Sequence, residues 1–172
     1  GSDFEETRII NPDNKKHFEE TIYNTRISNF IWYNNGFFYT EFQHKSENEK
    51  VTNPKVKYHS VGTDQSKDSL IYATRTKFQD VNIWKIREID EIGEEVEEDS
   101  QAYIFMEIYN NKTKNYGYFY LKDTEETDLK FRPLLARTKY ELNITEKVGN
   151  NFIAKVDIND KKQLIAIPAE AP

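Results

Sequence analysis

Hydrophobic residues occur along this chain in short runs rich in aromatic and β-branched side chains, and polar segments rich in Asn, Asp, Gly, Lys and Thr separate the runs. Aromatic and β-branched residues favour the pleated backbone of a strand, whereas Asn, Asp and Gly favour tight turns. The pattern therefore predicts an all-β fold. The predicted strands are residues 7–10, 29–33, 36–42, 55–61, 69–72, 82–86, 102–109, 115–121, 139–144, 152–156 and 163–167.

The predicted turns lie where Asn, Asp or Gly can adopt a positive φ at low cost. They are residues 34–36, 110–111, 149–151 and 159–160.

Several of the strand runs are apolar or aromatic at successive positions, as in GFFYTEF at 36–42, AYIFMEIY at 102–109 and YGYFYL at 116–121. A strand with one face in water would alternate between apolar and polar residues. Strands buried on both faces fit this pattern better. The blades of a β-propeller meet that condition, because each inner sheet is stacked between two neighbours.

A degenerate repeat supports the propeller. Paired runs begin at Gly36, Ala102 and Asn151, and the last two starts are separated by roughly the forty to fifty residues of one blade. The longer first interval indicates an insertion within 74–101, where the acidic run EIDEIGEEVEED is expected to be a solvated loop. The predicted organisation is a partial propeller over 3–172, with the end of a blade at 3–12 and three antiparallel blades at about 26–73, 74–123 and 131–168.

Composition and charge narrow the class of partner. The formal net charge is −6, whereas a nucleic-acid binder needs a basic stripe, so nucleic acid is not an expected partner. No apolar run approaches the roughly 18 residues that cross a membrane. The absence of cysteine excludes disulfides and leaves the compartment open between cytoplasmic and periplasmic or secreted. Because the chain begins Gly1-Ser2 and its only methionine is Met106, we expect residues 1–2 to be a cloning scar on an excised segment.

Two motifs occur in order near the start of the chain. A strand that carries a Trp leads through a short turn to a Gly-aromatic strand, and a second strand then ends in a Gly-Thr-x-Gln-Ser-x-Asp turn. With these motifs the chain resembles the propeller of the prolyl oligopeptidase family of serine peptidases, as do the segments 8–28 and 131–168. The matching motif residues are Trp32, Gly36, Phe37, Phe38, Tyr39, Tyr58, His59, Gly62, Thr63, Gln65, Ser66 and Asp68.

The resemblance implies a fold and a function. In this family a seven-bladed propeller caps an α/β-hydrolase domain, and the enzyme cleaves short peptides after proline. The segment would then be about three blades of the cap and would control the access of peptides to a serine nucleophile in the hydrolase domain of the same chain. We expect the parent protein to be a serine-type prolyl endopeptidase and the segment alone to be inactive.

The residues themselves support a non-catalytic role. A hydrolase of this kind needs a serine in a G-x-S-x-G turn, and the chain has no such motif. The histidines show no paired metal-ligand spacing, and no Gly-rich phosphate loop occurs, so no metal or cofactor is expected. His59 lies in a predicted strand and is interpreted as a structural histidine. Most of the aromatic residues, Trp32 among them, are expected to pack in the core.

One substrate-facing position follows from the resemblance. The family places an apolar side chain that faces the substrate just before the Trp-bearing strand, and Ile27 occupies that place. An arginine that the family directs at the substrate would fall near Tyr109, so strict proline specificity is not implied. Ile27 can equally be a core residue.

Two other functions remain open from the sequence. The segment can be a propeller that acts as a binding or scaffold module without a hydrolase partner, or the cap of a related propeller peptidase, such as an oligopeptidase that prefers basic residues or a dipeptidyl peptidase. Blades taken from a ring leave uncovered sheet faces, so we also expect the isolated segment to self-associate.

Overall fold

The computed structural model describes residues 5–10, 17–25, 30–43, 52–89, 101–123 and 129–169. The chain divides into two compact units, Gly1–Ile83 and Trp84–Pro172, and the division falls inside one strand. Ile27, the Gly1-Ser2 start and most of the acidic run at 88–99 lie outside the described residues, so the predictions made for them are not tested by the fold.

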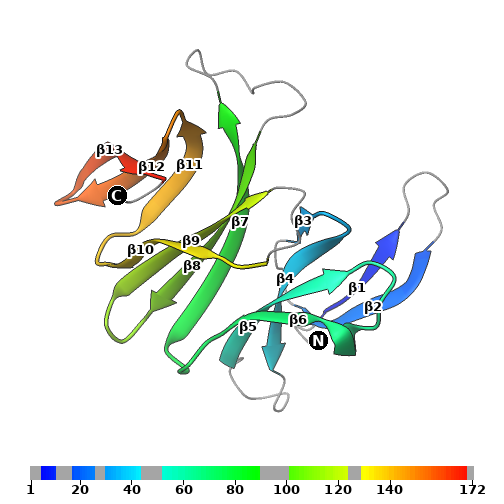
Figure 1. Cartoon of the computed structure of the whole chain (residues 1–172). Helices are drawn as coiled ribbons and strands as arrows, with labels where there is room; N and C mark the ends of the chain where they lie inside the picture. Colours follow the sequence, from blue (N-terminus) through cyan, green and yellow to red (C-terminus); the bar gives the residue numbers. More distant parts are fainter. Residues whose placement is uncertain are drawn as a thin grey trace. The chain divides into compact units, whose positions relative to one another are not determined.

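The first unit is built on a six-stranded sheet (Figure 1). Its strand order is β1-β2-β4-β5-β6, and β3 pairs with β4 as well. A short 3-10 helix, η1, connects β5 to β6. The elements are β1 (Glu5–Ile10), β2 (His17–Thr25), β3 (Ile31–Tyr33), β4 (Gly36–Gln43), β5 (Thr52–Ser60), η1 (Gln65–Lys67) and β6 (Ser69–Ala73).

The second sheet has seven strands in the order β10-β9-β8-β7-β11-β12-β13, and β7 begins in the first unit. The pairs β10–β9, β9–β8, β11–β12 and β12–β13 are antiparallel, whereas β7 and β11 run parallel at Lys147↔Glu88 and Val148↔Ile89. The strands are β7 (Gln79–Ile89), β8 (Ala102–Asn110), β9 (Asn115–Asp123), β10 (Arg132–Thr138), β11 (Leu142–Val148), β12 (Asn151–Ile158) and β13 (Lys161–Pro168).

Burial on both faces is observed for the apolar runs. Phe37, Phe38 and Tyr39 are consecutive on β4, and each exposes 2% or less of its surface. On β8 the five residues from Ala102 to Met106 are all buried. Since neighbouring residues of a strand point to opposite faces, such runs need cover on both sides, as the sequence pattern predicted.

Each unit has its own apolar core. In the first unit Ile9, Ile22, Phe37 and Tyr39 pack together, with Phe30 and Val61 at the margin. In the second unit, buried tyrosines also hold strands together through their hydroxyl groups: Tyr118 accepts a hydrogen bond from the backbone N–H of Leu142, and Tyr120 donates one to the carbonyl of Ala169. Aromatic rings thus supply both apolar contact and polar connections in this core.

The predicted turns at 34–36, 149–151 and 159–160 have a positive φ at Asn, Asp or Gly, whereas in the turn predicted at 110–111 the positive φ is at Lys114. Asn34 has a φ of 49° between β3 and β4, Gly149 has 54° between β11 and β12, and Asn159 and Asp160 have 53° and 60° between β12 and β13. Gly36 is required for a different reason. A Cβ built at this position would lie 2.0 Å from the carbonyl oxygen of His59, so only glycine allows β4 to start this close to β5.

Two strands are absent from the sequence predictions. The β2 strand was not in the predicted set, and the β10 strand was missed as well. β10 pairs with β9. It lies in the range 131–168 predicted for the last blade, whereas β9 lies in the range 74–123 predicted for the blade before it. The strand predicted at 139–144 begins instead at Leu142, and Tyr140 is exposed.

Candidate functional site

The motif Gly-Thr-Asp-Gln-Ser-Lys-Asp at residues 62–68 forms the turn between β5 and β6, called the exit turn. Gly62 begins it with a φ of 89°, a value that glycine adopts without steric cost. Asp64 then caps η1, because its carboxylate accepts a hydrogen bond of 2.8 Å from the backbone N–H of Ser66. The turn ends with a hydrogen bond from the backbone N–H of Asp68 to the carbonyl oxygen of Gln65.

Asp68 connects two strands below this turn. Its side chain is fully buried, and it receives a hydrogen bond of 2.6 Å from the Tyr39 hydroxyl on β4. Its other oxygen lies 2.7 Å from Nδ1 of His59 on β5, whose side chain is also fully buried. A carboxylate can only accept hydrogen bonds, so His59 carries its proton on Nδ1 and donates it to Asp68.

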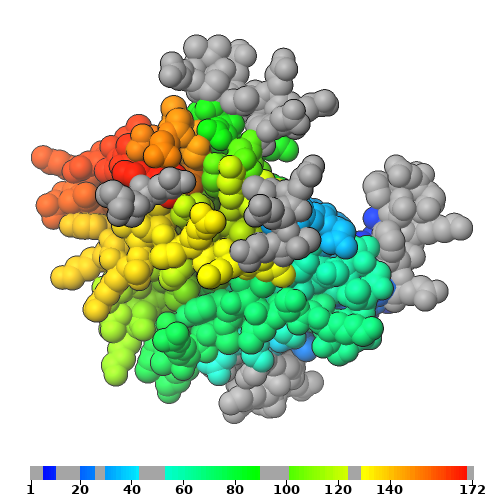
Figure 2. Space-filling view, viewed as in Figure 1, coloured from blue at the N-terminus to red at the C-terminus, as the bar shows by residue number. Residues whose placement is uncertain are grey.

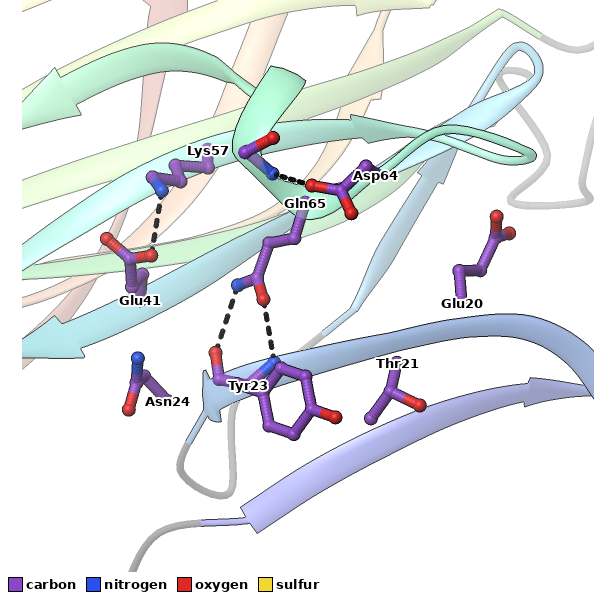
Figure 3. A pocket seen from close by; sticks show the side chains of 9 residues that line it. Glu20, Thr21, Tyr23, Asn24, Glu41, Lys57, Asp64 and Gln65 are labelled. Atoms are coloured by element: carbon purple, nitrogen blue, oxygen red, sulfur yellow. Dashed lines mark hydrogen bonds and ion pairs between the residues drawn. The ribbon is translucent and has the colours of Figure 1, made fainter.

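Gln65 links the exit turn to β2. Its amide nitrogen donates to the carbonyl oxygen of Tyr23 at 3.1 Å, and its amide oxygen accepts from the backbone N–H of Tyr23 at 3.0 Å (Figure 3). The same amide nitrogen donates to the Tyr39 hydroxyl at 3.1 Å. Three elements, β2, β4 and the exit turn, therefore meet at one side chain.

Glu20, also on β2, makes a second link to the exit turn. One of its carboxylate oxygens accepts a hydrogen bond of 2.7 Å from the backbone N–H of Gly62. The other oxygen is buried and lies 3.9 Å from Nε2 of His59. Among the residues that the structure describes, neither of these two atoms has a hydrogen-bond partner.

A cavity of about 490 Å³ lies beside these contacts and is lined by residues of β2, β4, β5 and the exit turn. Glu41 and Lys57 form an ion pair of 2.7 Å in its wall, and Glu20 and Asp64 add two further carboxylates (Figure 3). The wall is therefore negatively charged overall. The lining residues are Glu20, Thr21, Tyr23, Asn24, Glu41, Lys57, Asp64, Gln65 and Ser66.

Two groups in this region have perturbed ionisation. Burial, and next to it the hydrogen bond to Asp68, raises the pKa of Tyr39 far above its ordinary value, so its hydroxyl stays protonated and available as a donor. Hydrogen bonds from the hydroxyl and the backbone N–H of Ser66 lower the pKa of Asp64, which therefore caps η1 as a carboxylate.

The arrangement resembles part of a catalytic triad without its nucleophile. In a serine hydrolase Nε2 of the histidine accepts the proton of the serine hydroxyl. Here Nε2 of His59 faces Glu20, and the His59 side chain is 0% exposed, so no substrate atom can reach it. The pair of His59 and Asp68 connects β5 to the exit turn. Among the residues that the structure describes, no group of three or more His, Cys, Asp or Glu is placed to hold a metal ion.

The motif residues from the exit turn come together as a single site. Gln65 and Asp68 make the contacts above, and the Thr63 hydroxyl donates to the carbonyl of Ser60 at 2.7 Å. Tyr58 is the neighbour of His59 on β5, so its side chain points to the opposite face, where its hydroxyl donates to the carbonyl of Tyr33 at 2.9 Å. The Ser66 side chain is exposed at the rim of the cavity.

Trp32 differs from the prediction that it packs in the core, because it is 54% exposed. In the short β3 strand Tyr33 points inward and is 2% exposed, so the neighbouring Trp32 points to the opposite face. Its ring and that of its cross-strand neighbour Phe37 form a T-shaped pair, with 5.3 Å between the ring centroids. Trp32 therefore covers the margin of the core. Ile27, the predicted substrate-facing residue, lies outside the described residues.

Three contributors to the site were not predicted from the sequence. Glu20 and Tyr23 belong to β2, which the apolar pattern did not reveal, and Glu41 lies among apolar residues of β4. The one sequence signal for Glu41 is the pair of lysines, Lys55 and Lys57, on the neighbouring strand, which lie 3.9 and 2.7 Å from its carboxylate.

The comparisons with known proteins agree with one another. The family model described as the prolyl oligopeptidase N-terminal β-propeller domain matches residues 1–172. A prolyl endopeptidase of Elizabethkingia meningoseptica is 27% identical over 179 residues, which is 100% of this chain and 23% of that protein. A prolyl endopeptidase of Elizabethkingia miricola is 32% identical over 76 residues, which is 41% of this chain and 11% of that protein. The chain thus spans a quarter or less of the length of these relatives.

Solved structures show the same fold. Prolyl oligopeptidase B from Galerina marginata, without substrate, has a TM-score of 0.66 at 17% identity, over 98% of this chain and 24% of that chain. The same enzyme bound to a 35mer hydrolysis and macrocyclization substrate has a TM-score of 0.65 at 16% identity, over 98% of this chain and 26% of that chain. At these identities the likeness establishes a propeller fold and says nothing about substrate.

Proposed function

Because this chain belongs to the N-terminal β-propeller domain of the prolyl oligopeptidase family, we propose that it is part of a propeller cap that controls which peptides reach a serine nucleophile elsewhere in the parent protein. The observation that carries the proposal is the family match over the whole of residues 1–172, combined with coverage of only 23% of a full-length relative. The remaining length of such a relative leaves room for a separate catalytic domain.

The geometry of the described residues supports a non-catalytic role for the segment. The histidine that is paired with an aspartate, His59, has no exposed surface, and its free ring nitrogen faces a glutamate. A nucleophile needs a base within hydrogen-bond reach and a path for substrate. We therefore assign the peptide-bond chemistry to another domain and the selection of substrate by size to the propeller.

Selection by size follows from the rigidity of a closed ring. A narrow opening admits an extended, flexible peptide, whereas a folded domain is too wide and does not unfold often enough to enter. The proposed substrates are accordingly short peptides, and cleavage after proline is proposed from the family alone.

The first test is the coding sequence that follows Pro172 in the natural gene. We expect a G-x-S-x-G serine in frame, followed by an Asp and a His. A reading frame that ends without these residues would contradict the proposal and make the segment a binding module.

The second test measures size selection in the full-length protein. One proline-containing sequence is presented in three forms: as a peptide of about ten residues, within a long unfolded chain, and within a stable folded domain. We expect kcat/KM to be at least about 100-fold lower for the folded domain than for the short peptide, with the unfolded chain as the control for length, because unfolding limits entry. Equal cleavage of the folded and the short substrate would remove the access-control role.

A further inference from the structure

The strand β13 forms one margin of the second sheet, and among the residues that the structure describes no strand pairs with its outer side (Figure 1). On its inner side β13 pairs with β12 over eight residues, from Asn151↔Pro168 to Ile158↔Lys161, without a register shift. A regular strand at the margin of a sheet presents a row of N–H and C=O groups to which a further strand can bond. The outer side of β13 is therefore a place where a strand can be added.

The backbone groups on this outer side follow from one hydrogen bond. The N–H of Ala169 donates to the carbonyl oxygen of Asn150, so it points toward the β12 side. In an antiparallel ladder, successive residues direct their backbone groups to opposite sides, so Pro168 and every second residue before it point away from β12. A proline, which has no N–H, is tolerated on such an unpaired side. The N–H groups that point outward, called the outward amides, are those of Lys162, Leu164 and Ala166.

The side chains of the same stretch form an apolar margin beside these groups. Residues two apart on a strand share a face, so Leu164, Ala166 and Pro168 lie on one face of the sheet, and all three are exposed. Leu164 has 66% of its surface exposed, the largest fraction among the large apolar side chains that the structure describes. A cavity of about 510 Å³ lies beside it. An added strand would pair with the backbone of β13 and cover this apolar margin at the same time.

The other outermost strands are poorly suited to such pairing. β10 contains Pro133 near its start, and its ladder with β9 has two register shifts. β1 has two register shifts against β2, and the five-residue strand β6 has one against β5. Prolines, bulges and short strands keep the edges of sheets from pairing with other molecules. Of these outermost strands, β13 alone has an unshifted ladder, and its proline is at the last position.

A second copy of β13 fits this edge when the two strands run antiparallel. With Leu164 of each copy on a two-fold axis, the two leucines lie opposite each other, and Lys162 of one copy lies opposite Ala166 of the other. Like charges then do not face each other across the new ladder. Within each copy Lys162 is opposite Asp157 of β12, which offsets its positive charge. The edge therefore accepts its own copy without repulsion, and both leucines are removed from water.

We propose that two copies of this chain pair antiparallel through the outer sides of β13, with Leu164 at the two-fold axis. The second sheets of the two copies then form one continuous sheet. Backbone hydrogen bonds are exchanged between the two Leu164 residues, and between Lys162 and Ala166 in both directions. This inference concerns β12 and β13 and does not depend on the proposed function.

Hydrogen exchange of backbone amides tests the geometry on the unmodified 172-residue chain. The outward amides should exchange at least about tenfold more slowly at a concentration where the chain is dimeric than at one where it is monomeric. The amides of Gln163 and Ile165 point toward β12 and should be protected to the same extent at both concentrations.

Three outcomes of this measurement would overturn the proposal. Association through the faces of the sheets would leave the outward amides exchanging at the rate of the monomer. A monomer that protects these amides at every concentration would show that another segment of the chain covers the edge. A chain that stays monomeric with unprotected outward amides would show that the edge has no partner.

Two variants at one position isolate the edge. Ala166→Pro removes an outward N–H from each copy and leaves the bonds to β12 in place, so the dissociation constant of the dimer should rise at least about 100-fold. Ala166→Ser keeps the N–H at the same exposed position and should dimerise within about threefold of the original chain. Sedimentation measures the dissociation constants, and circular dichroism verifies that both variants fold. A folded Ala166→Pro variant that dimerises as tightly as Ala166→Ser would contradict pairing through β13.

Discussion

Asp68 accepts hydrogen bonds from Tyr39 and His59 in a place that water does not reach, so its carboxylate joins β4 to β5. We predict that Asp68→Asn lowers the free energy of unfolding by about 2–3 kcal/mol, because an amide keeps one acceptor and loses both the charge and the second strong bond. Urea unfolding followed by tyrosine fluorescence measures the loss. Asp157→Asn on an exposed position of β12 is the matched control and should change stability by less than about 0.5 kcal/mol.

Gly36 offers a test of close backbone approach. A methyl group there would collide with the backbone of His59 and the ring of Tyr58, and the backbone atom cannot move aside without breaking the ladder between β4 and β5. Gly36→Ala should therefore destabilise the chain by roughly 3 kcal/mol or more. Gly149 has a φ of 54°, and a Cβ at this position would meet open space. Gly149→Ala should therefore lower stability by only about 1 kcal/mol, through backbone strain alone. Equal losses in thermal unfolding would show that contact with His59 is not the reason for the glycine.

Glu107 on β8 makes stability depend on pH. Burial raises the pKa of its carboxyl above the ordinary 4.5, and the nearby Glu141 adds to the effect. A folded-state pKa above the unfolded one means that stability is fully present below pH 4.5 and is lost as the pH rises through the folded value. We predict that Glu107→Gln has the same thermal unfolding midpoint as the original chain at pH 4 and a higher one at pH 8. The glutamine carries no buried charge at pH 8, and its amide oxygen can still accept a hydrogen bond from Tyr118. A midpoint that falls at pH 8 would contradict the assignment.

At the scale of elements, the β12–β13 hairpin shows how turn chemistry sets a register. Its ladder runs without interruption from Asn151↔Pro168 to Ile158↔Lys161, and the two turn residues, Asn159 and Asp160, both have positive φ. Glycine adopts this conformation more easily than aspartate, so Asp160→Gly should raise stability by about 0.5–1 kcal/mol. Differential scanning calorimetry measures the melting temperature, which should rise in Asp160→Gly and fall in Asp160→Ala.

The elements also show what sequence patterns can predict. Runs of apolar residues located β4, β8 and β9, because a strand that is buried on both faces must be apolar throughout. The same reasoning missed β2 and β10. β2 reads HFEETIYNT, which lacks a continuous apolar run and includes Glu20, whose carboxylate bonds to the exit turn. β10 contains Pro133, which usually argues against a strand. Pro133 is tolerated because β10 is the outermost strand of its sheet.

The candidate site was predictable to the extent that its residues lie close in sequence. The Gly-Thr-Asp-Gln-Ser-Lys-Asp motif indicated a turn, and its capping and return contacts are local. Glu20 and Tyr23 are 42 residues from their partners Gly62 and Gln65, so pairing them required the tertiary structure. Trp32 was misjudged because a three-residue strand has no periodicity from which to choose its inward face.

At the scale of the whole molecule, each unit leaves large apolar side chains exposed, and we predict that the chain self-associates. Leu164 on β13 is 66% exposed, and β13 is the last strand of its sheet, orange to red at the surface in Figure 2. Leu164→Lys should weaken association at least about tenfold, since burying a leucine contributes about 1.5–3 kcal/mol. Light scattering after size exclusion, over a tenfold range of concentration, measures the effect. A single monomeric species at every concentration would contradict the prediction. Among the described residues, the large apolar side chains that are exposed are Ile10, Tyr23, Trp32, Leu70, Phe78, Tyr140 and Leu164.

Gln65 has a consequence for how this chain behaves during folding and storage. Its carboxamide has the same donor and acceptor as a peptide group, and it occupies both backbone hydrogen-bonding groups of Tyr23 at once. Unpaired groups of this kind on a strand recruit strands from other molecules and start fibrils. The exit turn thus serves as a one-residue substitute for a neighbouring strand. Without the Gln65 side chain, the backbone N–H and C=O of Tyr23 would be left unpaired and could pair with a strand of another molecule.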